Sequence, residues 1–164
     1  MKKFELTSEF ITNVFGVKLF RIRALVEFGD VKAGDLGGYV EKKENLDQNG
    51  NAWVCGNAQV YGNAEVSGNA QVYGNARVYG NADYATVKGF GRCNRNTTFF
   101  RCKDGKIRVV CGCFFGDLEE FRAIVKRTHG DGKLAKEYLA IADLMEMHFA
   151  KEGEDDTSRN PQQV

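Results

Sequence analysis

A six-residue unit, repeated without a gap, constrains this chain more than any other feature of its sequence. Each unit opens with Gly-Asn-Ala, and the units begin at Gly50, Gly56, Gly62, Gly68, Gly74 and Gly80. The fifth position is valine in every unit except the last, where it is Tyr84. A six-residue period matches neither the period of an α-helix nor simple strand alternation. Short repeats of this kind are typical of a parallel β-helix, in which three hexads form one triangular coil.

The alanine and valine of each hexad are its only regularly apolar positions, so we expect both to point inward. Glycine and asparagine are expected at the corners because they adopt left-handed turn geometry at low cost. The pattern extends back toward the N-terminus, where we place Val40 and Leu46 in the alanine position. On this interpretation the hexads run from Gly38 to Ala85.

Folding the repeat on a period of three hexads sorts the outward residues into three faces. The first face carries Trp53, Gln71, Cys55 and Tyr73, the second Gln59, Arg77, Tyr61 and Tyr79, and the third Glu65, Asp83, Ser67 and Ala85. One interpretation is that these are ordinary solvated side chains. The other is that the tyrosine columns form a subunit interface, since stacked exposed aromatic residues mark contact surfaces.

The segments on either side of the repeat are predicted to close its ends, because a short stack of coils needs caps. We expect an N-terminal β cap in residues 1–37, with a strand over 18–26, followed by the β-helix in residues 38–91. Residues 92–150 are predicted to hold a β-hairpin and two α-helices. The polar tail, residues 151–164, is expected to be disordered.

Turn and cap signals locate the C-terminal elements. Asp104-Gly105 between two apolar runs predicts the hairpin. Cys111 and Cys113 are expected on one face of a strand by simple alternation. Asp117 and Glu120 form a capping box for the first helix, which Gly130 ends. The inner side of the second helix is predicted to carry Leu134, Tyr138, Ile141, Leu144, Met145 and His148.

Composition narrows the partners of the protein. The net charge of +1 provides no field that would attract nucleic acid or an anionic membrane. No apolar run is long enough to span a membrane, and the N-terminus lacks a signal-peptide core, so we expect a cytoplasmic protein. The five cysteines are an odd number without paired zinc-knuckle spacing, which predicts free thiols and no metal.

Three stretches together resemble one family. They are residues 18–40, with Lys-Leu-Phe-Arg-Ile-Arg-Ala-Leu at their start, the Gly-Asn-Ala hexads, and residues 103–130, with Cys-Gly-Cys-Phe and Thr-His-Gly. The combination is similar to hexapeptide-repeat proteins of bacteriophages and prophages, often labelled as transferases or polymer-forming proteins. The resemblance implies a left-handed β-helix, a phage or prophage origin with a host bacterial cytosol as the location, and a homotrimer. It implies no catalytic residues for this sequence.

Many left-handed hexapeptide β-helices are trimeric acyltransferases, which need a histidine base on a coil. The two histidines of this chain, His129 and His148, fall in the predicted helices instead. No cysteine has a histidine beside it in sequence, and no phosphate-cradling glycine motif is present. We therefore favour a protein that is not an enzyme and has no cofactor, and keep acyl transfer as an alternative.

A non-catalytic binding protein fits the outward residues best. Arginine presents a planar fork to an anion, and tyrosine offers a stacking surface and a hydroxyl group. We predict a site for a small anionic, nucleotide-like ligand at the trimer interfaces, which would suit sequestration of a host immune signal. Its expected residues are Arg77, Tyr61, Tyr79, Tyr73, Arg21 and Arg23. The alternative is a module that binds a host protein or assembles with further copies.

Overall fold

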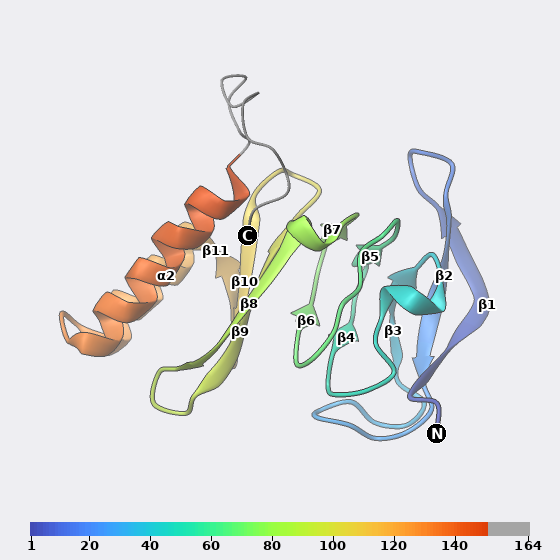
Figure 1. The fold of residues 1–164 in the computed structure, drawn as a ribbon, viewed down its shortest axis with the longest axis horizontal. Helices are drawn as coiled ribbons and strands as arrows, with labels where there is room; N and C mark the ends of the chain where they lie inside the picture. The colour runs from blue at the N-terminus through green and yellow to red at the C-terminus, as the bar shows by residue number, and fades with distance from the viewer. Residues whose placement is uncertain (151–164) are drawn as a thin grey trace, which may run out of the picture.

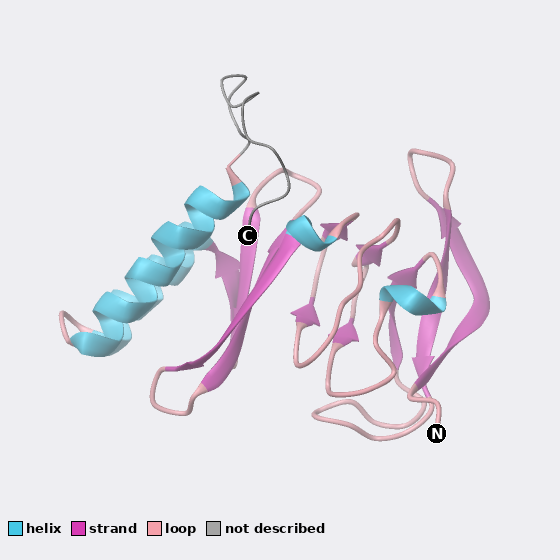
Figure 2. Ribbon diagram, viewed as in Figure 1, coloured by secondary structure: helices cyan, strands magenta, loops and turns pink. Residues whose placement is uncertain are grey.

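The computed structural model describes residues 1–150, and the predicted tail at 151–164 lies outside the described residues (Figure 1). The chain is mainly β, with both α-helices at the C-terminal end and two short 3-10 helices, η1 and η2, beside the coils (Figure 2). The N-terminal and central elements are β1 (Phe4–Thr12), β2 (Lys18–Ala24), β3 (Leu36–Val40), η1 (Lys43–Asn45), β4 (Trp53–Val54), β5 (Gln59–Val60), β6 (Gln71–Val72), β7 (Arg77–Val78) and η2 (Asn81–Asp83). The C-terminal elements are β8 (Tyr84–Phe90), β9 (Arg95–Arg101), β10 (Ile107–Cys111), β11 (Phe114–Asp117), α1 (Leu118–His129) and α2 (Lys133–Phe149).

The hexads form short parallel strands that pair one coil apart. Gln59 of β5 lies opposite Arg77 of β7, and Trp53 of β4 lies opposite Gln71 of β6; both pairs are 18 residues apart (77 − 59 and 71 − 53). Three hexads therefore make one coil, as predicted. The glycines that open the first five units have φ between 62° and 66°, which places them at left-handed corners.

The inward positions are also as predicted. The valines from Val54 to Val78 have no exposed surface, and the hexad alanines from Ala52 to Ala76 are at most 2% exposed. Together they form the apolar lumen of the coils, which gives most of the hydrophobic stabilisation of this region.

The predicted register of the first coil is wrong. Val40 pairs with Val60, and Leu46 bridges to Val66, so both occupy the valine column rather than the alanine column. Each pair is 20 residues apart (60 − 40 and 66 − 46), which means that the first coil is two residues longer than the second. The extra length lies between Leu46 and Val54, which are eight residues apart (54 − 46) instead of six.

Lys3 forms hydrogen bonds with residues of this longer corner. Its buried Nζ donates hydrogen bonds to the carbonyl oxygens of Ala52 at 2.9 Å and Asn49 at 3.3 Å. The backbone N–H of Lys3 donates to Gln48 Oε1 at 2.8 Å. Burial lowers the pKa of Lys3, whereas the neighbouring Asp47 raises it. These contacts satisfy carbonyl groups that the irregular corner leaves without a strand partner.

The N-terminal strands close one end of the coils by pairing along a coil face. The β1–β2 hairpin adds to β3 in antiparallel fashion, which gives a sheet ordered β1-β2-β3-β5-β7. The edge of the first coil is therefore covered by β2, as the sequence predicted. This sheet is mixed, because β3, β5 and β7 run parallel to one another.

The sixth hexad does not continue the coil. Its Asn81–Asp83 segment forms the short helix η2, and the chain then enters β8. The predicted hairpin proves to be part of a four-stranded antiparallel sheet, ordered β11-β10-β9-β8. Cys111 and Cys113 do not share a strand face, because Gly112 and Cys113 form the turn between β10 and β11, where Gly112 has a φ of 60°.

This second sheet lies between the coils and the helices (Figure 1). Adjacent phenylalanines of β9 point to its opposite faces: Phe100 joins the core of the coils, and Phe99 joins the core beneath α1 and α2. The edge of the last coil is tied to the sheet by polar contacts. Thr98 Oγ1 accepts from the Gln71 N–H at 3.1 Å, and Asn96 Nδ2 donates to the Asn69 carbonyl at 3.0 Å.

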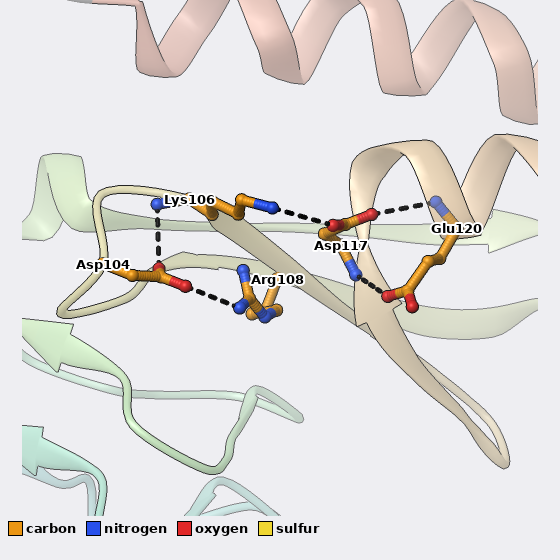
Figure 3. Close-up of polar contacts among 5 residues, drawn as sticks. All are labelled: Asp104, Lys106, Arg108, Asp117 and Glu120. Atoms are coloured by element: carbon orange, nitrogen blue, oxygen red, sulfur yellow. Dashed lines mark hydrogen bonds and ion pairs between the residues drawn. The ribbon is translucent and has the colours of Figure 1, made fainter.

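The first helix begins and ends as predicted, between Asp117 and Gly130. Asp117 Oδ1 accepts from the backbone N–H of Glu120 at 2.9 Å, and Glu120 Oε2 accepts from the N–H of Asp117 at 2.8 Å (Figure 3). Two expectations for the inner face of α2 are wrong, since Leu144 and His148 are exposed. The buried face of α2 instead uses small residues at two positions; it consists of Ala135, Tyr138, Ile141, Ala142, Met145 and Phe149.

Loss of the Asp117 cap should destabilise the protein in a pH-dependent manner. The hydrogen bond from Glu120, aided by Lys106 and Arg108, holds the pKa of Asp117 below its usual value. The capping contribution is therefore present above about pH 4, the ordinary Asp value, and is lost as pH falls through the folded pKa. We expect Asp117→Ala to lower the free energy of unfolding by about 1 kcal/mol at neutral pH.

Urea unfolding of the wild type and the variant at neutral and acidic pH tests this expectation. Asp131→Ala is the matched control, because Asp131 is an exposed carboxylate in the turn between the helices. An equal effect of the two substitutions at neutral pH would contradict the capping role of Asp117.

Candidate functional site: a groove on the first coil face

The outer side of the β3-β5-β7 face presents two rows of polar and aromatic side chains. Since Val40, Val60 and Val78 point inward, their neighbours along each strand point outward. The row before the valines is Tyr39, Gln59 and Arg77, and the row after them is Glu41, Tyr61 and Tyr79.

Tyr61, Arg77 and Tyr79 line a groove with a volume of about 730 Å³. The rings of Tyr61 and Tyr79 are tilted toward each other with centroids 5.4 Å apart. Tyr61 is buried, whereas Tyr79 is 64% exposed at the rim. The groove is lined by Phe15, Val17, Glu41, Tyr61, Gly62, Arg77, Tyr79, Asp83 and Arg101.

The two carboxylates of the groove already have partners. Glu41 Oε2 accepts from the backbone N–H of Gly62 at 2.7 Å. Asp83 accepts from the N–H of Tyr79 at 2.9 Å and from Arg101 Nε at 3.2 Å. Both acids therefore help to shape the groove and are less available to a ligand.

Arg77 differs from the other charged residues of the groove. Its Nη1 donates to the neutral Gln59 Oε1 at 2.8 Å, and within residues 1–150 it has no carboxylate partner. Burial raises the pKa of Tyr61, and the Arg77 charge partly opposes that shift. Tyr61 is thus a neutral phenol at physiological pH, able to donate a hydrogen bond beside a guanidinium group with free donors.

The structure brings together three of the six residues predicted to bind ligand. Arg21 lies three strands from Arg77 in the same sheet, about 14 Å away at the usual strand spacing. It donates to the Tyr39 hydroxyl at 2.9 Å and forms an ion pair with Glu9. Arg23 donates a hydrogen bond to Glu5 on the outer surface of the N-terminal cap.

Tyr73 lies on a different face of the coils. It continues the β4-β6 face, and its ring centroid is 6.1 Å from that of Phe115 in β11. Burial is the main cause that raises the pKa of Tyr73, and the neighbouring Cys55 and Asp30 raise it further. This tyrosine packs between the coils and the C-terminal sheet and does not line the groove.

Other groove residues had no signal in the hexad pattern. Phe15 and Val17 come from the β1–β2 hairpin, and Arg101 comes from the end of β9. The β1–β2 hairpin and β9 reach the coil face only because the N-terminal cap and the C-terminal sheet pack at the two ends of the coils. The hexad pattern predicts that Asp83 lies on the third outward face with Glu65. The break at η2 instead turns Asp83 toward Tyr79 and Arg101.

The remaining reactive groups lie outside the groove. His129 ends α1, and His148 lies in the last turn of α2. The five cysteines are free thiols, and burial raises the pKa of Cys55 to about 12 and of Cys102 to about 11. In the described residues, no group of three or more histidine, cysteine or acidic side chains could hold a metal ion. No helix within them is long and apolar enough to cross a membrane.

Comparison with known proteins found a similarity for the coil region alone. No curated protein matched the sequence. The family model of the YdcK β-solenoid repeat matches residues 58–72 and again residues 70–82. The matched stretch begins just before β5 and ends in η2, so it lies within the run of hexads that starts at Gly50. This part of the chain is similar to a β-solenoid repeat, in agreement with the parallel strand pairing.

Proposed function

We propose that this protein is a non-catalytic binding protein that holds a small anionic, ring-containing ligand in the groove of Tyr61, Arg77 and Tyr79. The observation that carries the proposal is the placement of Arg77. Its guanidinium group lies beside two tyrosine rings and has no carboxylate partner in the described chain. An arginine in that setting offers charge-assisted hydrogen bonds to an anion, while an aromatic ring stacks on the tyrosines.

The finer features of the proposal follow from the resemblance to hexapeptide-repeat proteins of phages. We propose a left-handed coil, a homotrimer, and a groove that a neighbouring subunit closes. The rim of the groove supports a covering partner, because Phe15 is 74% exposed and Tyr79 is 64% exposed. A nucleotide-like signal of a bacterial immune system is the proposed ligand, held and not converted.

A second candidate function is binding of a host protein. The tip of the β1–β2 hairpin favours it, since Val14 is 81% exposed next to Phe15. Exposed apolar side chains that protrude from a rigid sheet are common at protein interfaces. On this candidate, the groove would receive a side chain of the partner protein.

Calorimetric titration with ADP-ribose and with a cyclic dinucleotide tests the proposed function. We expect at least one of them to bind, and Arg77→Gln to weaken that binding by about 10-fold to 100-fold, because a hydrogen bond to a charged group is lost. Arg23→Gln is the matched control, since Arg23 pairs with Glu5 away from the groove. Failure of both nucleotides to bind, or an equal loss in the control, would contradict the proposal.

A further inference from the structure

A second cavity lies at the far end of the molecule from the N-terminal cap. It has a volume of about 300 Å³ and is formed between the sheet and the helices, close to the β8–β9 turn and the end of α1. Figure 1 shows that turn and the α1–α2 turn on the same side of the C-terminal layers. The cavity is lined by Arg92, Cys93, Arg95, Cys111, Phe114, Phe121, Ile124, Val125, Thr128, His129 and Tyr138.

The floor of this cavity is apolar and well ordered by aromatic packing. Phe121 is 2% exposed and meets the ring of Tyr138 edge-on at 5.8 Å and that of Phe114 at 5.6 Å. Val125 and Ile124 complete the helix side. Such a floor is suited to one ring or a short aliphatic chain, and the volume is far smaller than that of the groove on the coils.

The mouth of the cavity carries two arginines that lack acidic partners. Neither Arg92 nor Arg95 forms an ion pair with any carboxylate in the described part of the chain. Interaction with the side chain of Cys93, aided by Cys111 and Cys113 nearby, raises the pKa of Arg95. Its guanidinium group is therefore surrounded by thiols rather than by carboxylates.

Gly112 makes room for this guanidinium group. A Cβ atom at Gly112 would lie 1.7 Å from Arg95 Nη1, so any other residue there would displace the arginine. The left-handed φ of 60° at Gly112 also favours glycine in the tight β10–β11 turn. Glycine at position 112 thus leaves space for the Arg95 side chain at the mouth of the cavity.

The imidazole ring of His129 forms part of the cavity wall. His129 Nδ1 is shielded from solvent, and no described residue forms a hydrogen bond with it. The imidazole ring stacks on Tyr138, with centroids 6.0 Å apart and an interplanar angle of 23°. His129 is therefore held in the cavity wall by stacking on Tyr138, and its shielded Nδ1 does not open into the cavity.

We propose that this cavity is a second binding site, for a small carboxylate with an apolar ring or chain. The apolar part lies against Phe121 and Val125, and the carboxylate is held by Arg95. The site is independent of the groove on the coils, because the two share no lining residue. A nucleotide is too large for it.

Fluorine NMR with 4-fluorobenzoate tests this assignment, with 4-fluorobenzyl alcohol as the uncharged analogue. We expect the benzoate to bind at least about tenfold more tightly than the alcohol, as loss of a charge-assisted hydrogen bond implies. Arg95→Gln should abolish that preference. Arg127→Gln is the matched control, because Arg127 is an exposed arginine of α1 that does not line the cavity.

Two results would overturn the proposal. One is equal affinity of the wild type for the benzoate and the alcohol, which would show that the cavity recognises no anion. The other is a benzoate preference that does not depend specifically on Arg95. This would be seen if the preference remained in Arg95→Gln, or if it were lost to the same extent in Arg127→Gln. Both readouts are independent of nucleotide binding, so this site and the coil groove are judged separately.

Discussion

Replacing Phe100 with alanine is expected to lower the free energy of unfolding by about 3–5 kcal/mol, the usual cost of removing a buried phenylalanine ring. Phe100 has no exposed surface and belongs to the same apolar cluster as the valines of the coils. Its ring, carried by β9, covers the end of the lumen beyond the last coil. Without it, the lumen would face a cavity, and the coil region would lose its C-terminal cap.

The sole tryptophan provides a local probe for this test. Trp53 is 3% exposed and lies on the outer face of the coils, where its ring packs edge-on against Phe28, whereas far-ultraviolet dichroism at the helix bands follows α1 and α2. Phe99→Ala is the matched variant, since Phe99 is equally buried but faces the helices. We expect Phe100→Ala to shift the Trp53 transition to lower denaturant. A loss of less than about 1 kcal/mol would contradict the capping role.

The second large effect is expected from a charge placed inside the coils. Val60→Asp should destabilise the protein by roughly 3–5 kcal/mol, the range for a buried charge without a partner. Val60 is fully buried between Val40 and Val78 in the inward column of the β3-β5-β7 face. No polar group of that column can compensate the carboxylate.

The pH dependence of this variant identifies the cause. Burial raises the pKa of a carboxyl group, so the introduced Asp becomes neutral and less harmful as pH falls through that raised value. Denaturant unfolding at about pH 8 and about pH 5 should show a smaller deficit at the lower pH. Asn63→Asp, at an exposed corner, is the control. Equal stability of the two variants would contradict the inward assignment of Val60.

The regular part of the fold could be predicted because the hexads repeat the same glycine, alanine and valine positions. An alanine and a valine separated by one residue define an inward edge, and a glycine at the left-handed corner defines the turn. The helix ends were predictable for a similar reason, since Asp117, Glu120 and Gly130 act on the backbone next to them. Local chemistry was sufficient in both cases.

The errors arose where distant segments decide the structure. The first coil is two residues longer than the second, and its longer corner is hydrogen-bonded by Lys3, far away in sequence. The face of α2 was misjudged because the sheet accepts small residues, Ala135 and Ala142, in place of Leu144. The turn at Gly112 broke the expected alternation of Cys111 and Cys113.

The candidate groove shows the same division. The hexad period placed Tyr61, Arg77 and Tyr79 on one face, and the structure joins these three in one groove. Phe15, Val17 and Arg101 entered it through tertiary pairing of the caps, which no repeat pattern encodes. The second cavity depends wholly on such long-range packing, since its lining comes from the β8–β9 turn, the ends of β9, β10 and β11, and both α-helices.

The central claim is that the coil groove holds an anionic ligand in an assembly of three chains. Native mass spectrometry of protein freshly purified from cells, before and after heat release of small molecules, tests it most directly. We expect a trimer that carries a nucleotide-sized added mass, released chemically unchanged, and an Arg77→Gln trimer that lacks this mass. A monomer without added mass would contradict the account.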